Sequence, residues 1–181
     1  MIFIFLLYLL ITFFTILFSI HLIQEMTSRA FFVPLPKNVL DKIISKIDFK
    51  DGGKIYDLGS GDGRFVFSVS KKNKKIKVVG IERSFLPYLI SIFLLEFGDY
   101  ENVKILRKNF FDCNLKDATH VFVYLSPSLM DMLLPKFKSE LPKGAKVISC
   151  DFIFSEKECK QVIDLGRENE ARAKKLYIYE F

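Results

Sequence analysis

The sequence predicts an α/β domain with a mostly parallel sheet, preceded by one helix long enough to span a membrane. Three observations support this prediction. The first 24 residues carry no charged side chain. Runs of β-branched and apolar residues then alternate with stretches of helical spacing, which is the pattern of a parallel sheet covered by helices. A glycine-rich turn, DLGSGDGRF at 57–65, follows the first such run, where α/β folds place a ligand-binding loop.

The apolar segment 1–24 is predicted to be a transmembrane anchor, because about 20 apolar residues cross the hydrocarbon core of a bilayer as a helix. A cleaved signal peptide is the alternative, but it requires a basic region ahead of the apolar stretch, and the first cation of this chain is Arg29. All lysines and arginines follow the segment. The positive-inside rule therefore predicts a single-pass protein with its folded domain in the cytoplasm.

Residues 25–37 are predicted to be a linker, since FFVPLPKN carries two prolines that resist regular structure. The folded domain is then 38–181. Its predicted helices have apolar residues at helical spacing and are NVLDKIISKI (38–47, with Asn38 as N-cap), RFVFSVSKK (64–72), SFLPYLISIFLLEFGDY (84–100, with Ser84 as N-cap and Gly98 as stop) and SLMDMLLPKFKSEL (128–141, interrupted at Pro135).

The predicted strands share short β-branched or aromatic runs. They are KIYDLGSG (54–61, ending in the glycine turn), IKVVGIER (76–83), VKILR (103–107), THVFVYL (119–125), AKVISC (145–150), KQVIDL (160–165) and KKLYIYEF (174–181). The charged stretch GRENEARA joins the last two, which predicts a C-terminal hairpin.

The helix at 84–98 is apolar on nearly every side and is too short to span a membrane. Ordinary core packing explains most of it. One outer face is a candidate for contact with the anchor helix or the bilayer, because a helix that is apolar all round is usually covered by something.

Composition narrows the chemistry further. The net charge of +6 raises the question of nucleic acid, but the densest basic run, KKNKKIK at 71–77, has no interleaved aromatics, so a solvated turn is expected there and no nucleic-acid partner. Anionic lipid is the second interpretation of that charge. Three cysteines without C-x-x-C spacing indicate reduced thiols, and two histidines cannot assemble a zinc site by the usual spacings, so no metal is expected.

The glycine turn at 59–63 is predicted to be a cofactor-binding loop. Gly59 allows a tight turn, Gly61 leaves room for the ligand, and Gly63 lets the next helix approach the strand. The dinucleotide fingerprint would require a small residue at Arg64. A purely structural glycine turn is the alternative, but the strand, the loop, the helix and a spaced acid agree with one another.

Charge identifies the kind of cofactor. Asp57 and Asp62 would repel a pyrophosphate but favour S-adenosylmethionine, which carries an ammonium and a sulfonium. Glu82 ends the second predicted strand, where an acid accepts hydrogen bonds from ribose hydroxyls in nucleotide-binding folds. The loop therefore predicts an adenosyl cofactor with a positive end.

These residues resemble the class I, seven-β-strand, S-adenosylmethionine-dependent methyltransferases. More narrowly, the chain from about Phe31 onward resembles the small membrane-anchored lysine methyltransferases that modify the ATP synthase c-subunit and the adenine nucleotide translocase, together with their prokaryotic relatives. The segments that carry this resemblance are FFVPLPKNVLDKI, YDLGSGDGRFVF, GIERS, KNFFDCNL and VFVYLSPSLMDMLLPKFKSELPKGAKVIS. The resemblance implies a Rossmann-like seven-stranded sheet with a C-terminal antiparallel hairpin.

The resemblance also implies roles for individual residues. The methionine part of the cofactor would lie against the loop, the ribose against Glu82, and the adenine against Asn109 with Phe110 beside the ring. The segment Phe32, Val33 and Pro34 would close over the cofactor as a lid, with linker packing as the alternative. The loop residues implied for the methionine part are Asp57, Gly59, Ser60, Gly61 and Gly63.

Two departures affect the substrate side. YLSP at 124–127 stands where amino-group methyltransferases of another type carry NPPY, and the chain has no tryptophan in the tail where the family has one. Tyr124 and Ser126 are expected to orient a substrate amine, with no general base assigned.

The predicted function is methylation of a lysine in a small membrane protein. A methyltransferase acting on a lipid-like or quinone-like molecule is the first alternative, and a non-catalytic cofactor-binding scaffold is the second.

Overall fold

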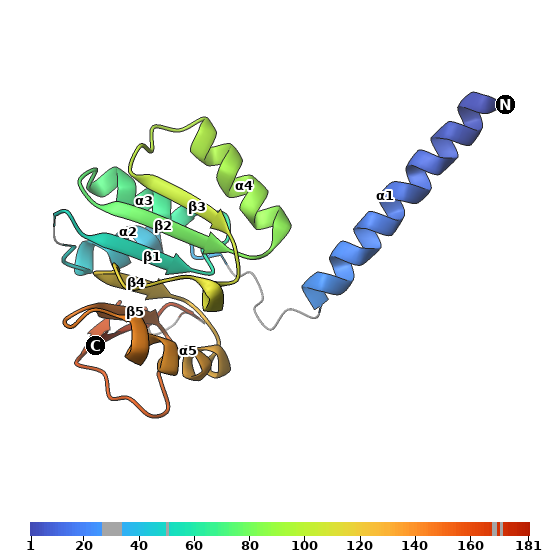
Figure 1. Ribbon diagram of the computed structural model, residues 1–181. Helices are drawn as coiled ribbons and strands as arrows, with labels where there is room; N and C mark the ends of the chain where they lie inside the picture. The colour runs from blue at the N-terminus through green and yellow to red at the C-terminus, as the bar shows by residue number, and fades with distance from the viewer. Residues whose placement is uncertain (27–33, 50, 168–169, 171) are drawn as a thin grey trace. The chain divides into compact units, whose positions relative to one another are not determined.

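The structure is a computed structural model that describes residues 1–26, 34–49, 51–167, 170 and 172–181 (Figure 1). The chain divides into two compact units, Met1–Phe32 and Val33–Phe181. The predicted domain boundaries stay a prediction. Of the proposed lid, Phe32 and Val33 lie outside the described residues, and Pro34 is exposed.

The first unit is helix α1, Ile2–Met26, within which Ile2–Ile20 is long and apolar enough to cross a membrane. Three hydroxyl groups of this helix have hydrogen-bond partners inside it. The hydroxyls of Thr12, Thr15 and Ser19 donate to the carbonyls of Tyr8, Thr12 and Thr15 at 2.8–3.1 Å. Internal partners of this kind are what a lipid environment requires of polar groups, although length and composition alone do not separate a span from a signal sequence.

The second unit is built on a seven-stranded sheet in the order β3-β2-β1-β4-β5-β7-β6. β3 through β5 of this order are parallel, and β7 is antiparallel to both β5 and β6. The strands are β1 Lys54–Leu58, β2 Lys77–Glu82, β3 Val103–Arg107, β4 His120–Val123, β5 Lys146–Cys150, β6 Gln161–Asp164 and β7 Lys175–Glu180. The predicted fold class and the C-terminal hairpin are confirmed.

The helices of this unit are α2 Lys37–Lys46, α3 Arg64–Lys72, α4 Phe85–Glu96 and α5 Pro127–Glu140, with a 3-10 turn at Phe110–Asp112. α2 and α3 bury apolar stripes in one cluster with the sheet, in which the Phe65 and Phe122 rings stack at 3.9 Å. β1, β4 and β5 are buried on both faces, as the central strands of a parallel sheet should be.

Two local predictions were wrong. Helix α2 begins one residue before Asn38, because Pro36 occupies the N-cap position and its carbonyl accepts from Val39 N and Leu40 N at 3.0 and 3.1 Å. Helix α5 continues through Pro135 without the expected interruption. Leu134 and Phe137, on either side of the proline, are buried, so packing outweighs the one backbone hydrogen bond that proline removes.

Candidate active site

The carboxyl ends of β1 to β5 lie at one edge of the sheet, because these five strands are parallel (Figure 1). β1 lies between β2 and β4, so the chain reverses its order of strands there, and ligands of open α/β sheets bind at such a point. The predicted residues lie at or after these strand ends, with Asp57 near the end of β1. The glycine loop follows β1, Glu82 ends β2, Asn109 follows β3, and Tyr124 follows β4.

The glycine loop adopts a conformation that suits glycine alone. Gly59, Gly61 and Gly63 have φ values of 82°, 56° and 82°. The amides of Gly59 and Ser60 donate to the carbonyl of Ile81 on β2 at 2.8 and 3.0 Å. This pairing turns the loop across the end of β2 and leaves a bare backbone facing the edge of the sheet.

Glu82 fastens that loop to the start of α4. Its carboxylate accepts from Gly61 N at 2.8 Å and from Ser84 N at 2.6 Å, and the side chain is 8% exposed. Ser84 occupies the predicted N-cap position of α4, although its side chain makes no cap bond within the described chain. A carboxylate oxygen accepts about two hydrogen bonds, so each oxygen keeps capacity for a ligand hydroxyl.

Asp57 is the most electrostatically stressed group at this edge. It is buried at the end of β1, and burial raises its pKa well above the usual range of an aspartate. The neighbouring charges of Glu82 and Asp62 raise the pKa of Asp57 further. A cation bound at this point would relieve both effects, because it favours the charged carboxylate.

Arg64 balances part of that negative charge, a pairing that the sequence pattern did not predict. Its guanidinium contacts both carboxylate oxygens of Asp62, at 2.9 and 3.1 Å from Nε, and donates to the Leu35 carbonyl at 2.8 Å. Asp62 is therefore partly balanced within the protein, and Asp57 and Glu82 are left to attract a cation. Arg64 also ties the loop to the segment that precedes α2.

Ser60 offers an independent sign that a ligand belongs here. Its hydroxyl is buried and has no hydrogen-bond partner among the residues that the structure describes. Buried polar atoms are nearly always paired, so an orphaned hydroxyl inside a glycine loop fits a missing polar ligand. Together with the bare backbone and the two carboxylates, it fits an adenosyl cofactor with a cationic tail.

Asn109 and Phe110 lie after β3 on the same edge of the sheet. The Asn109 side-chain oxygen accepts from Phe111 N at 3.2 Å and caps the 3-10 turn, which leaves its amide group as a donor. The rings of Phe110 and Phe111 lie 4.9 Å apart, and both are half-buried. This is a polar edge with an aromatic wall, although the adenine contact itself stays a prediction.

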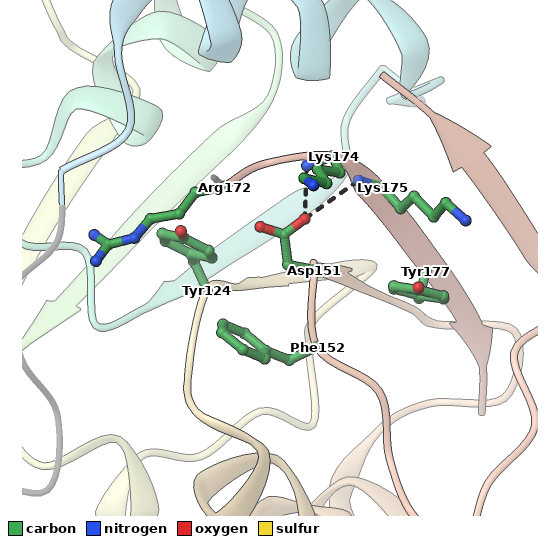
Figure 2. A pocket seen from close by; sticks show the side chains of 7 residues that line it. All are labelled: Tyr124, Asp151, Phe152, Arg172, Lys174, Lys175 and Tyr177. Atoms are coloured by element: carbon green, nitrogen blue, oxygen red, sulfur yellow. Dashed lines mark hydrogen bonds between the residues drawn. The ribbon is translucent and has the colours of Figure 1, made fainter. Parts of the chain in front are cut away.

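A pocket of about 540 Å³ opens beyond β4 and β5 (Figure 2). The rings of Tyr124 and Phe152 lie face to face in it, 5.9 Å apart. Burial raises the pKa of Tyr124 to about 12, and the nearby Cys150 and Asp151 add to the shift. Ser126 is not among the lining residues described, and its hydroxyl lies 3.2 Å from that of Ser128. The structure thus brings Tyr124 to the pocket but not Ser126. Its lining residues are Tyr124, Asp151, Phe152, Arg172, Lys174, Lys175 and Tyr177.

Asp151 holds two segments of that pocket together, and the sequence pattern did not predict this role. It has a φ of 64°, unusual for a residue other than glycine. Its carboxylate accepts from the amides of Ala173, Lys174 and Lys175, so it fixes the start of β7 beside the end of β5 (Figure 2). An acid directly after a buried strand was the one available signal.

Known proteins resemble this chain in both sequence and fold. Residues 57–161 match the family described as ANTKMT methyltransferase domain. The chain belongs to this family. A protein-lysine N-methyltransferase of Saccharolobus islandicus is 29% identical over 81% of this chain and 92% of its own length. The adenine nucleotide translocase lysine N-methyltransferase of Mus musculus is 36% identical over 55% of this chain and 44% of its own length. An RNA methyltransferase from Salinibacter ruber, crystallised with S-adenosyl-L-homocysteine, superposes with a TM-score of 0.72 at 29% identity, covering 82% of this chain and 93% of that one.

The methyltransferase is therefore an enzyme of the Rossmann-like class, and its cofactor is S-adenosylmethionine. The chain spans nearly all of the archaeal relative but less than half of the mouse one. Among the described residues, no group of three or more His, Cys, Asp or Glu side chains is placed to hold a metal ion.

Proposed function

We propose that this methyltransferase transfers a methyl group from S-adenosylmethionine to a lysine of a small membrane protein. α1 would anchor it as a single-pass protein, with residues 25–37 as the linker and the domain from 38 onward on the cytoplasmic side. The relatives from Saccharolobus islandicus and Mus musculus carry lysine N-methyltransferase activity in their names, and the second is named for the adenine nucleotide translocase.

One observation supports the proposal most directly. The cofactor loop and the pocket are neighbours, since Leu58 of β1 pairs with Val123 of β4, and the chain continues into Gly59 on one side and Tyr124 on the other. A Cβ atom on Gly59 would lie 3.3 Å from the Leu125 side chain. A substrate group in the pocket would thus reach a methyl group held by the loop.

In this proposal different residues bind different parts of the cofactor. The loop backbone, Ser60 and Asp57 hold the methionine end, Glu82 takes the ribose hydroxyls, and Asn109 and Phe110 take the adenine. When bound, the cofactor supplies an electrophilic methyl group on a positively charged sulfur. Displacement of that methyl needs little covalent help from the protein, so positioning supplies much of the rate.

The substrate lysine must arrive as a neutral amine with a free lone pair. The rim of the pocket is cationic, with Arg172, Lys174 and Lys175 outnumbering an Asp151 that is committed to backbone amides. Positive neighbours and burial both lower the pKa of an incoming lysine, which favours its neutral form. Tyr124 and Phe152 would align the aliphatic part of that side chain, and the Tyr124 hydroxyl would orient the amine.

The same cationic rim keeps one alternative open. An acidic or phenolic small molecule of quinone-like or lipid-like character would also suit aromatic walls bordered by cations. A protein that binds the cofactor without turnover is the remaining alternative.

The experiment is transfer of radiolabelled methyl from S-adenosylmethionine by the full chain to native membranes. Label in a protein band, placed on a lysine by mass spectrometry, supports the proposal. Label in the lipid extract supports the small-molecule alternative, and label in RNA contradicts both. Cofactor binding without any label supports the scaffold. The Glu82→Gln variant should lower labelling strongly at limiting cofactor, and Glu140→Gln, which changes a carboxylate at the end of α5, should keep it.

A further inference from the structure

The outer face of α4 exposes large apolar side chains that the fold does not use. Ser91 of this helix is fully buried, while its phenylalanines face outward. The other helices of the domain do the reverse and bury their apolar stripes. We call the exposed set the α4 face, and it consists of Phe85, Leu86, Leu89, Ile90, Phe93, Leu94 and Phe97, each between 42% and 77% exposed.

The α4 face is continuous along the helix. Residues 85, 89, 93 and 97 form one row at a spacing of four, and residues 86, 90 and 94 form a second row beside it. The Phe93 and Phe97 rings touch, with centroids 4.6 Å apart. The opposite side of α4, with Tyr88, Ile92 and Leu95, packs against the core. Contiguous apolar patches of this extent are rare on soluble proteins and mark a protein or membrane contact.

Cations border the amino-terminal end of the α4 face. The guanidinium of Arg107 lies 4.9 Å from the centre of the Phe85 ring, and Arg83, just before the helix, is exposed. Phenylalanine and leucine rows flanked by arginine have the composition of helices that lie in a bilayer interface. Arginine at the border can reach anionic headgroups while its neighbours reach the acyl chains.

The linker would hold the domain close to a bilayer. Ten residues join Met26 of α1 to Lys37 of α2. A segment of that length reaches at most about 35–40 Å. This step rests on the proposed function, in which α1 lies in the membrane. A domain tethered that closely meets the lipid surface at high effective concentration, so a weak apolar face is enough to hold it there.

We infer that the α4 face docks on the surface of the bilayer. Its two apolar rows reach the boundary of the acyl chains, and Arg83 and Arg107 lie among anionic headgroups. Because α4 begins directly after Glu82, its amino-terminal end lies at the edge of the sheet that carries the active site. Docking therefore brings that edge to the membrane, and the lysines it selects are those close to the headgroup level.

A single tryptophan tests this in the full chain. The protein contains none, so Phe93→Trp introduces a unique fluorescent probe in the α4 face. Val162→Trp is the matched control, because Val162 is 49% exposed and lies on β6, the sheet edge opposite β3. Each variant is reconstituted in vesicles of mixed zwitterionic and anionic lipid, with and without brominated acyl chains.

The inference expects emission of the Phe93→Trp variant to shift to shorter wavelength and to be quenched by brominated lipid, with the Val162→Trp variant unaffected. A shift without quenching would mean that protein covers the face, either α1 or a second copy, and would overturn the inference. Absence of both effects, or equal quenching of the two variants, would overturn it as well.

A second variant separates this inference from the proposed function. Phe93→Gln with Phe97→Gln changes exposed side chains and should leave cofactor affinity intact. It should lower methyl transfer to membranes several-fold, because two phenylalanines that become buried in the bilayer on docking would stabilise the docked state. Lipid quenching without any lysine methylation would refute the proposed substrate and leave the docking intact. Lysine methylation without quenching would do the opposite.

Discussion

The two sides of the active-site edge are built in opposite ways. On the side of β1, β2 and β3, backbone amides and carboxylates make the site, with Glu82 bridging Gly61 and Ser84. On the side of β4, β5 and β7, aromatic and basic side chains line a pocket, and a single carboxylate, Asp151, joins segments that are 22 residues or more apart. The first side combines backbone amides with buried carboxylates, whereas side chains line the second.

This difference predicts which substitutions each side of the site tolerates. A backbone site tolerates few substitutions, because glycine conformations and buried charges determine its shape. A side-chain pocket can be altered residue by residue while the fold stays intact. Substitutions on the first side should therefore weaken or abolish cofactor binding, and those on the second should alter substrate use while cofactor affinity is retained.

Gly63→Ala should have the largest effect. A Cβ atom there would lie 2.6 Å from the Phe67 ring, which is buried and packed on Tyr100, and the φ of 82° adds about 1–2 kcal/mol of strain. We expect loss of cofactor binding and a clear fall in melting temperature. Gly144→Ala is the control, since Gly144 has a φ of 85° but no described heavy atom within 4 Å of that position. Equal melting temperatures for the two variants, with cofactor binding intact, would falsify the steric argument.

Glu82→Gln should have the next largest effect. It removes a charge that two amides and the proposed ribose contact share, and hydrogen bonds to charged groups contribute about 1.5–3 kcal/mol each. Calorimetry with S-adenosylmethionine should show affinity weakened by roughly tenfold to a hundredfold. Glu140→Gln should leave affinity unchanged, because Glu140 pairs with Lys136 and Leu115 N at the far end of α5. A full loss in both variants would point to destabilisation of the domain instead.

The contrast between the two sides also explains what the sequence could predict. Asp57 and Glu82 lie in the last residues of buried strands and the glycines follow one of them, so local pattern placed them at one edge. Asp151 and the contact of Arg64 with Leu35 join residues that lie 22 to 29 positions apart, and no local pattern records such partners. Pro135 misled for the same reason, since its cost is local but the packing of Phe137 that outweighs it is not.

Pairing also changes the charge that the loop presents to the cofactor. Sequence alone counts Asp62 with Asp57 as free negative charge. The structure pairs Asp62 with Arg64, so Asp57 and Glu82 remain.

Asp57→Asn should produce a smaller, pH-dependent effect of opposite sign on stability and on binding. The pKa of Asp57 is higher in the folded state than in the unfolded state. Its contribution to stability is therefore fully present below the unfolded-state pKa near 4 and is lost as pH rises through the folded-state pKa. The variant should therefore gain stability over the natural chain, and the gain should grow with pH. Its affinity for the cationic cofactor should fall most at high pH. Denaturant unfolding and calorimetry at several pH values measure both, and a stability difference that does not vary with pH would contradict the assigned cause.

Tyr124→Phe should have the smallest effect and the most selective one. It keeps the ring against Phe152 and removes only the hydroxyl, so we expect kcat with a lysine substrate to fall a few-fold and cofactor affinity to stay unchanged. Phe152→Leu removes the ring pair, worth about 0.5–1.5 kcal/mol, and should lower kcat/KM by roughly twofold to tenfold.

Because the pKa of Tyr124 is raised to about 12, its phenol stays neutral at physiological pH and orients the amine as a hydrogen-bonding group. The pH–rate profile of the Tyr124→Phe variant should therefore keep its shape below pH 10, whereas a profile that loses one of its ionisations would make Tyr124 the proton acceptor.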